Sequence, residues 1–177
     1  MPNYKRAFVP GGTWFFTVNL LQRQKNDLLI REIELLRQTV KRVKVKYPFT
    51  IDAWVVLPDH IHCVWTLPPN DADFSTRWRL IKSGSSRALP NTEYRSKVRI
   101  AAGERDIWQR HYWEHYIRDD LDYQRHIDYV HVNPLNHGYV RRVTDWPYSS
   151  FHRYVEKGIY PENWCGDVNN MDVEGGD

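Results

Sequence analysis

Two histidines one residue apart, His60 and His62, have the types and spacing that could hold a metal ion. They lie in the segment 60–67, whose alternation is typical of a β-strand, and alternate strand residues point to the same face of a sheet. The imidazoles would stand side by side, roughly 7 Å apart at about 3.3 Å per residue. The opposite face would be apolar and buried under helices; it carries Ile61, Cys63, Trp65 and Leu67. Two imidazoles do not complete a coordination sphere, and a pair of hydrogen-bonded or surface histidines is the alternative.

A second candidate group lies on a helix that the sequence predicts from about residue 120 to 133. Pro134 is expected to end this helix, because proline lacks the N–H that a helix interior uses. Tyr129 and Asn133 are four residues apart and would lie one turn apart on the same face, with His126 on a neighbouring stripe. A tyrosine hydroxyl becomes a nucleophile where a metal or base activates it. The sequence alone leaves open whether this face meets the histidine strand, and otherwise Tyr129 is a structural residue.

Basic and aromatic residues are concentrated in the segment 77–118. It contains ten Lys or Arg residues and four acidic ones, whereas the formal net charge of the whole chain is +3. Cations beside aromatic rings suit a nucleic-acid backbone with bases stacking nearby, although a solvated basic face over core aromatics would give the same pattern. Residues 166–177 carry four acidic and no basic side chains. We expect a single domain over 1–165 and a loosely ordered acidic tail over 166–177 that could fold back on the basic surface.

The composition indicates a globular protein. The chain has 177 residues, of which 41% are hydrophobic and 27% charged, enough for one domain with a core. No apolar run approaches the roughly 20 residues needed to cross a bilayer, and no signal-peptide pattern is present. Cys63 and Cys165 do not form a CxxC motif, which argues against a disulfide framework or a structural zinc site. A cytoplasmic protein without a membrane partner is therefore expected.

The elements that would position these side chains alternate along the chain. Residues 13–20 and 51–57 are rich in β-branched and aromatic types, and 112–118 can form a fourth strand. A helix between the first two strands is predicted by apolar residues at steps of three and four: Leu29, Ile33, Leu36, Val40, Val43 and Tyr47. Asp73 could cap a second helix that ends near Ser83, and 84–107 reads as an irregular loop. This strand–helix–strand–strand–helix–strand order predicts an α+β, ferredoxin-like antiparallel sheet, with the tyrosine helix after the fourth strand.

Several blocks of the chain resemble a family of enzymes that cut single-stranded DNA. Residues 54–62 read WVVLPDHIH, which is similar to the His-hydrophobic-His strand of single-tyrosine HUH transposases. Four further blocks resemble one branch, the REP-associated tyrosine transposases: GGTWFFTVN at 11–19, WEHYIR at 113–118, DYVHVNP at 128–134 and DWPYSS at 145–150. The resemblance spans about residues 4–165. It implies an HUH endonuclease fold and an enzyme that cleaves and rejoins REP elements, which are palindromic single strands that fold into hairpins.

The resemblance also implies roles for individual residues. His60 and His62 correspond to ligands of one Mg²⁺ or Mn²⁺ ion, and Tyr129 to the nucleophile that forms a 5′-phosphotyrosine intermediate. Asn133 stands where the insertion-sequence relatives have Gln. Because Asn is one methylene shorter, it could bind the metal directly, bind it through water or only support the helix. His115 and His126 are candidates for orienting groups.

DNA contacts are expected from two groups of residues. The first comprises Tyr4, Lys5 and Arg6, and the second Arg77, Arg79 and Lys82 on the outer face of the helix that Asp73 caps. Solvated surface charge is the alternative for each. The family branch that this chain resembles implies a monomer, whereas the insertion-sequence relatives are dimers that share active sites.

Two other classes of function remain open. A domesticated, non-cleaving nucleic-acid-binding protein on the same fold would not need His60, His62 and Tyr129 together. A zinc hydrolase would use the histidine pair, but the sequence shows no evident third ligand such as a His-x-x-x-His or a cysteine pair. A covalent protein–DNA adduct would distinguish the transposase from both.

Overall fold

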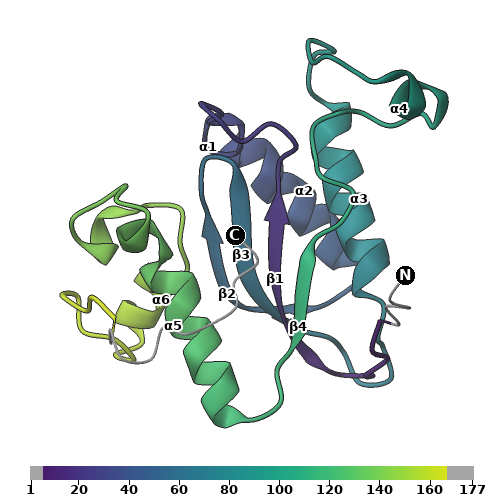
Figure 1. Cartoon of the computed structure of the whole chain (residues 1–177). Helices are drawn as coiled ribbons and strands as arrows, with labels where there is room; N and C mark the ends of the chain where they lie inside the picture. The colour runs from purple at the N-terminus through teal and green to yellow at the C-terminus, as the bar shows by residue number, and fades with distance from the viewer. Residues whose placement is uncertain (1–5, 167–177) are drawn as a thin grey trace, which may run out of the picture.

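A computed structural model describes residues 6–166 of the chain. Four strands form one antiparallel sheet in the order β2-β3-β1-β4 (Figure 1). The strands are β1 (Thr13–Asn19), β2 (Thr50–Val56), β3 (His60–Thr66) and β4 (Trp113–Tyr116). The helices are α1 (Leu28–Arg31), α2 (Ile33–Lys46), α3 (Phe74–Arg87), α4 (Lys97–Ala101), α5 (Asp120–Asn136), the 3₁₀ turn η1 (Val143–Asp145) and α6 (Phe151–Glu156). This order confirms the predicted ferredoxin-like arrangement.

One face of the sheet is buried under α2 and α3, as Figure 1 shows. Alternate residues of the central strands point into this layer because the side-chain period of a strand is two. They are Trp14, Phe16 and Val18 of β1 and Ile61, Cys63 and Trp65 of β3. The apolar face predicted for the histidine strand is therefore confirmed.

The other face of the sheet packs against α5. Phe15, Val55 and Val64 form a second core with Ile127 and Val130 of α5. In the register of β1 with β3, Thr17 pairs with His62 and Asn19 with His60. The motif histidines thus stand on the α5 face, near the end of the sheet at which β3 begins.

The helix layer differs from the prediction in one respect, since the helix expected over 29–47 is divided. Glu32 has φ −106° and ψ 29°, outside the helical range, and separates α1 from α2. The predicted cap of α3 is confirmed, because the carboxylate of Asp73 accepts a hydrogen bond from the backbone N–H of Thr76. A Cβ atom at Gly84 would lie 2.8 Å from the methyl carbon of Thr39, so α2 and α3 approach closely because residue 84 has no side chain.

Three predicted boundaries were wrong. α3 continues to Arg87, and α4 lies inside the segment 84–107 that was expected to be irregular. α5 does not stop at Pro134 but continues to Asn136. Proline fixes a helical φ and removes only one N–H, and the next turn is still closed by the bond from the N–H of His137 to the carbonyl of Asn133.

Some expectations concern residues that the structure does not describe. Tyr4, Lys5 and the acidic tail after Gly166 lie outside the described residues. Within residues 6–166, no helix has the length and apolar character needed to span a membrane.

Candidate active site

The two motif histidines stand next to each other in the sheet and are almost fully buried. His60 is 1% exposed and His62 is 0% exposed. The centroids of their rings are 4.8 Å apart, and the ring planes are nearly perpendicular at 86°. The strand therefore presents the two imidazoles together on the α5 face, as the spacing predicts.

Each motif histidine is oriented at its Nδ1 atom. Nδ1 of His60 lies 2.7 Å from Oδ1 of Asp59, and Nδ1 of His62 lies 2.8 Å from Oγ1 of Thr17 on the neighbouring strand. Such partners fix the ring and leave Nε2 as the atom that could bind a metal. Nε of Arg23 donates to Oδ2 of Asp59 at 2.8 Å. Burial alone would raise the pKa of Asp59, but the hydrogen bonds from His60 and Arg23 lower it to about 2, so this carboxylate is charged at neutral pH.

Helix α5 places Tyr129 against the histidine pair. The ring centroid of Tyr129 is 5.2 Å from that of His62 in an edge-on arrangement, and Tyr129 is 8% exposed. Phe15 packs against both rings, with centroids 5.8 Å from each. The tyrosine face of the helix therefore meets the histidine strand, which the sequence left open.

The next two turns of the same helix face carry two further possible ligands. Asn133 is 2% exposed, and among the described residues its buried Oδ1 has no hydrogen-bond partner. His137, one more turn along, has its ring centroid 5.3 Å from that of His60. The possible ligand atoms of His60, His62 and His137 all lie within 4.8 Å of one another. These donors fit a divalent metal ion, because imidazole nitrogen and amide oxygen are both metal ligands.

His137 was missed in the sequence although a signal for it exists. Tyr129, Asn133 and His137 are spaced by four residues, so they share one face of a continuous helix. The expected stop at Pro134 removed His137 from that helix. The signal becomes readable only when α5 is known to continue beyond the proline.

The two histidines predicted as orienting groups belong to a separate cluster. Nε2 of His115 on β4 lies 2.9 Å from Oδ2 of Asp122, and Nδ1 of His126 lies 2.7 Å from the carbonyl oxygen of Asp122. The rings of His115 and His126 stack with centroids 4.5 Å apart. Burial lowers the pKa of His126. Phe15 lies 4.9 Å from the ring of His126 and also contacts Tyr129, so it connects this cluster to the candidate nucleophile.

The structure contradicts the surface position expected for Arg77. Its side chain is 1% exposed, and its guanidinium donates to Asp71 and to three backbone carbonyls, those of Tyr47, Pro48 and Asp73. All five of its N–H groups have acceptors within the fold. Arg77 thus ties the start of α3 to the end of α2 instead of facing outward.

The other candidates for DNA contacts have different surroundings. Arg79 is exposed. Nζ of Lys82 donates to the carbonyl of Gln109 at 2.8 Å, and burial, with the nearby charge of Arg99, lowers its pKa to about 8. Arg6 forms an ion pair with Glu114 at 2.9 Å.

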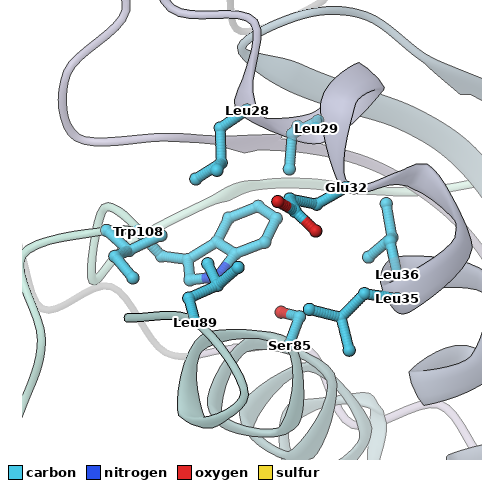
Figure 2. Close-up of a pocket in the computed structure, with 9 residues that line it drawn as sticks. Leu28, Leu29, Glu32, Leu35, Leu36, Ser85, Leu89 and Trp108 are labelled. Atoms are coloured by element: carbon cyan, nitrogen blue, oxygen red, sulfur yellow. The ribbon is translucent and has the colours of Figure 1, made fainter. Parts of the chain in front are cut away.

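A small apolar cleft on the opposite face of the sheet does not compete with this site. It lies among α1, α2 and α3, and Leu28, Leu29, Leu36 and Leu89 surround the indole of Trp108 (Figure 2). Its volume is about 20 Å³, which is close to the space of a single water molecule. Such a cleft is a packing gap and not a ligand site.

Known proteins share both the sequence and the fold of this chain. The family of IS200-like transposases matches residues 18–133. The chain is 48% identical to the REP-associated tyrosine transposase of Escherichia coli (strain K12), over 97% of this chain and 95% of that protein. A Haemophilus influenzae relative (strain ATCC 51907 / DSM 11121 / KW20 / Rd) that carries the same family name is 47% identical, over 94% of each chain.

A solved structure extends this similarity to three dimensions. It is that of a REP-associated tyrosine transposase bound to a REP hairpin, and it matches with a TM-score of 0.85 and 46% identity over 100% of this chain and 98% of that chain. Sequence and fold therefore agree. The chain belongs to the REP-associated tyrosine transposases, within the IS200-like transposase family.

Proposed function

We propose that this transposase cleaves and rejoins single-stranded DNA beside REP-type hairpins through a covalent bond to Tyr129. The observation that carries the proposal is the position of Tyr129, whose ring lies 5.2 Å from that of His62 on the buried face of the sheet. The names of the relatives support the choice of substrate, since one solved relative is bound to a REP hairpin.

The reaction exchanges one phosphoester for another. The hydroxyl oxygen of Tyr129 loses its proton and attacks the scissile phosphorus, the bond to the 3′ oxygen breaks, and that oxygen takes up a proton to become a 3′-hydroxyl, so that no net proton is consumed. The product is a 5′-phosphotyrosine, which conserves the energy of the ester. Attack by a 3′-hydroxyl on this phosphorus then reverses the step and joins the strands without ATP.

The histidine cluster would hold the cofactor for this reaction, which we propose to be Mg²⁺ or Mn²⁺. His60 and His62 supply two nitrogen ligands, and Asn133 or His137 supplies a third from the tyrosine helix. A bound divalent cation would withdraw charge from the phosphoryl oxygens. Because the ligands lie on both β3 and α5, binding would also fix the helix that carries Tyr129 against the sheet.

One chain supplies the whole candidate site. His60 and His62 come from β3, and Tyr129 from α5 of the same chain contacts His62 directly. A partner subunit is not needed to complete it. We therefore propose that the transposase acts as a monomer on hairpin DNA.

The test uses the full chain and a labelled hairpin with single-stranded flanks, incubated with Mg²⁺. The wild type should form a covalent protein–DNA band on a denaturing gel. Tyr129→Phe should abolish this band and leave DNA binding nearly unchanged, because only the hydroxyl is lost.

The matched control is Tyr123→Phe, six residues earlier on α5. The Tyr123 hydroxyl donates to Oδ1 of Asp52, whose other carboxylate oxygen accepts from Thr66 at the opposite end of β3 from His60. This variant should still form the adduct. An adduct that survives in Tyr129→Phe would move the nucleophile to another tyrosine and contradict the proposal, and the absence of any adduct in the wild type would favour a non-cleaving binding protein.

A further inference from the structure

A large groove at the edge of the sheet lies outside the site described above. It runs between α2 and the edge strand β2 and is closed by the segment 148–153, which leads into α6. Its volume is about 700 Å³. Figure 1 shows β2 at the left edge of the sheet, with α2 behind the sheet and α6 to the left of β2. The groove is therefore wide enough to hold an extended chain of a ligand.

The charges that line the groove have one sign. Arg37, Lys41 and Lys44 follow one stripe of α2, and Arg153 faces them from α6. Among the described residues that line the groove, none is acidic. Glu34 pairs with Arg37 at 2.6 Å, but its side chain is exposed and does not line the groove. A groove of this charge fits a polyanion.

Aromatic rings form part of the same groove. Phe49, Trp54 and Tyr148 line it together with the cations. The guanidinium of Arg37 lies 6.0 Å from the ring centroid of Tyr148, and Nζ of Lys44 lies 5.7 Å from that of Phe49. Phe49 is only 6% exposed, so Trp54 and Tyr148 are the accessible rings of the groove. Cations beside accessible rings are the combination that proteins use to bind single-stranded nucleic acid.

A continuous row of rings joins this groove to the candidate active site. Tyr148 contacts Trp146 at 5.5 Å, Trp146 stacks on Tyr139 at 5.3 Å, and Tyr139 stacks on His137 at 5.8 Å between ring centroids. His137 in turn contacts His60. We call the three rings Tyr139, Trp146 and Tyr148 the aromatic track.

The aromatic track is held firmly on the edge strand. Nε1 of Trp146 donates to the carbonyl of Val56 at 3.0 Å, and the N–H of Val56 donates to the carbonyl of Tyr148 at 2.9 Å. Val55 of β2 pairs with His62 of β3, so the track and the histidines lie at the same end of the sheet. Tyr139 is 44% exposed and offers its ring to solvent. The block DWPYSS at 145–150 thus builds a surface that leads away from the histidines.

We propose that the single strand flanking the hairpin leaves the active site over the aromatic track and enters the basic groove. Its bases stack on Tyr139 and the neighbouring rings, and its phosphates contact Arg37, Lys41, Lys44 and Arg153. This inference rests on the proposed function, because it assigns the path of the same DNA. A duplex would not use the rings, since its bases are already stacked on one another.

The first test compares hairpins with and without single-stranded tails. Binding of the full chain is measured by fluorescence anisotropy for a blunt hairpin, a hairpin with a 5′ tail and one with a 3′ tail. The wild type should bind one of the tailed hairpins more tightly than the blunt one. The double variant Lys41→Glu/Lys44→Glu should weaken that complex about tenfold and leave the blunt hairpin nearly unchanged.

Salt dependence adds a second readout for the same variant. Loss of two contacts to a single strand should reduce the slope of log K against log salt by about 1.4, that is about 0.7 for each phosphate. The single variant Lys41→Glu is compared with Lys97→Glu, which changes the net charge by the same amount, because Lys97 is exposed on α4, away from the groove. An equal effect of Lys97→Glu, or an equal loss for blunt and tailed hairpins, would show a general charge effect and overturn the proposal.

The aromatic track is tested by Tyr139→Leu and Tyr139→Phe. Leu removes the ring and should weaken tailed-hairpin binding about fivefold, whereas Phe keeps the stacking surface and should retain affinity. Photo-crosslinking from iodouracil placed along the tail gives an independent readout in the wild type. Crosslinks should fall on Tyr139, Trp146 or Tyr148, and crosslinks confined to α3 would contradict the path.

The two proposals fail in different ways. A wild type that forms no covalent adduct on the tailed hairpin would contradict the proposed function. If the adduct forms but the groove and track variants bind the tailed hairpin like the wild type, only the path of the strand is wrong.

Discussion

His60 and His62 have different chemical partners, and this difference affects how each could bind a metal. Nδ1 of His60 faces a carboxylate that is charged at neutral pH, whereas Nδ1 of His62 faces the hydroxyl of Thr17. A carboxylate partner raises the basicity of an imidazole ligand more than a neutral partner does. His60 should therefore be the stronger ligand of the pair, and Arg23 holds its carboxylate in place.

The histidine cluster leads to a prediction about metal affinity. His60→Ala and His62→Ala should each reduce cleavage by orders of magnitude, because one remaining imidazole of the pair holds the ion poorly. EDTA should have the same effect on the wild type, and Mg²⁺ or Mn²⁺ should restore activity. In the proposed site, either His137 or Asn133 supplies the third metal ligand. The alanine variant of that residue should bind Mn²⁺ at least about tenfold more weakly than the wild type in calorimetry.

His111→Ala provides the control for this experiment, because His111 is exposed on the loop before β4. It should leave Mn²⁺ binding unchanged. Full cleavage by the wild type in excess chelator would remove the metal from the proposal and make the histidines structural.

At the level of elements, alternation along the strands was a reliable guide. The pattern of apolar residues in 60–67 was sufficient to predict which face of β3 lies under helices. The break between α1 and α2 could not be predicted, because Leu29 and Ile33 keep helical spacing across Glu32. Spacing reports which side of the chain is buried, not whether every backbone bond is helical.

Arg77 shows why the position of a cation on a helix face is hard to predict. It lies three residues after Phe74 and one before Trp78, which is the buried stripe of α3, and only its charge suggested an outward position. Its long side chain instead reaches the carbonyls of Tyr47 and Pro48, which lie just beyond the end of α2. These partners are distant in sequence, so no local pattern reveals them.

This buried network predicts opposite effects for two arginines of α3. Arg77→Met should lower the free energy of unfolding by about 3 kcal/mol, because it leaves Asp71 and three carbonyls without their donor. Arg79→Met, on the exposed side, should change it by less than about 0.5 kcal/mol. Urea unfolding of both variants checks this, and a larger effect at Arg79 would be inconsistent with the structure.

Paired carboxylates in the loops around α3 predict how stability depends on pH. The hydrogen bonds from Arg77 hold the pKa of Asp71 below its usual 3.8, and those from Arg105 hold the pKa of Glu93 at about 2. A carboxyl group whose pKa is lower in the folded than in the unfolded chain stabilises the fold fully at pH values above its unfolded-state pKa. This stabilisation is lost as the pH falls through its folded-state pKa. Stability should therefore decline from about pH 4.5 towards pH 2.

Arg105→Met isolates the contribution of Glu93 to this decline. Without the guanidinium, the pKa of Glu93 should return towards its ordinary value, so the loss of stability on acidification should be smaller than in the wild type. Urea midpoints at pH 6, 4 and 3 measure it. Stability that increases on acidification would contradict the assignment.

At the level of the whole molecule, the number of charges along the sequence does not by itself locate the basic surface. The segment 77–118 has more Lys and Arg than Asp and Glu, but several of these cations form ion pairs or hydrogen bonds within the fold. Arg99 pairs with Asp106 at 2.6 Å, and Arg105 binds Glu93 and the carbonyls around it. Cations of α2 line two open grooves, one of which is also lined by Arg87. A sequence count does not separate cations that meet solvent from those that meet acceptors of the same chain.

The arrangement of the site predicts which form of DNA is cleaved. Tyr129 and the two motif histidines are nearly buried, between α5 and the sheet. A scissile phosphate must therefore leave a base-paired stack to reach the tyrosine. Opening a duplex costs about 1.4 kcal/mol for each base-pair step, and the sequence shows no Walker-type motif that could supply this energy from ATP. Cleavage should occur on single strands that flank a hairpin.

Denaturing gels of three matched substrates test this dependence on DNA form: a hairpin with a single-stranded flank, the same hairpin with the flank annealed to its complement, and a linear duplex of the same sequence. The annealed flank should be cut at least about tenfold more slowly, since opening even two base-pair steps costs about 2.8 kcal/mol. Binding of the flanked hairpin should weaken steeply with salt, because lysines and arginines displace counterions from phosphates. Equal cleavage of the duplex would require that the phosphate reaches Tyr129 without unpairing, which the buried position of the tyrosine does not allow.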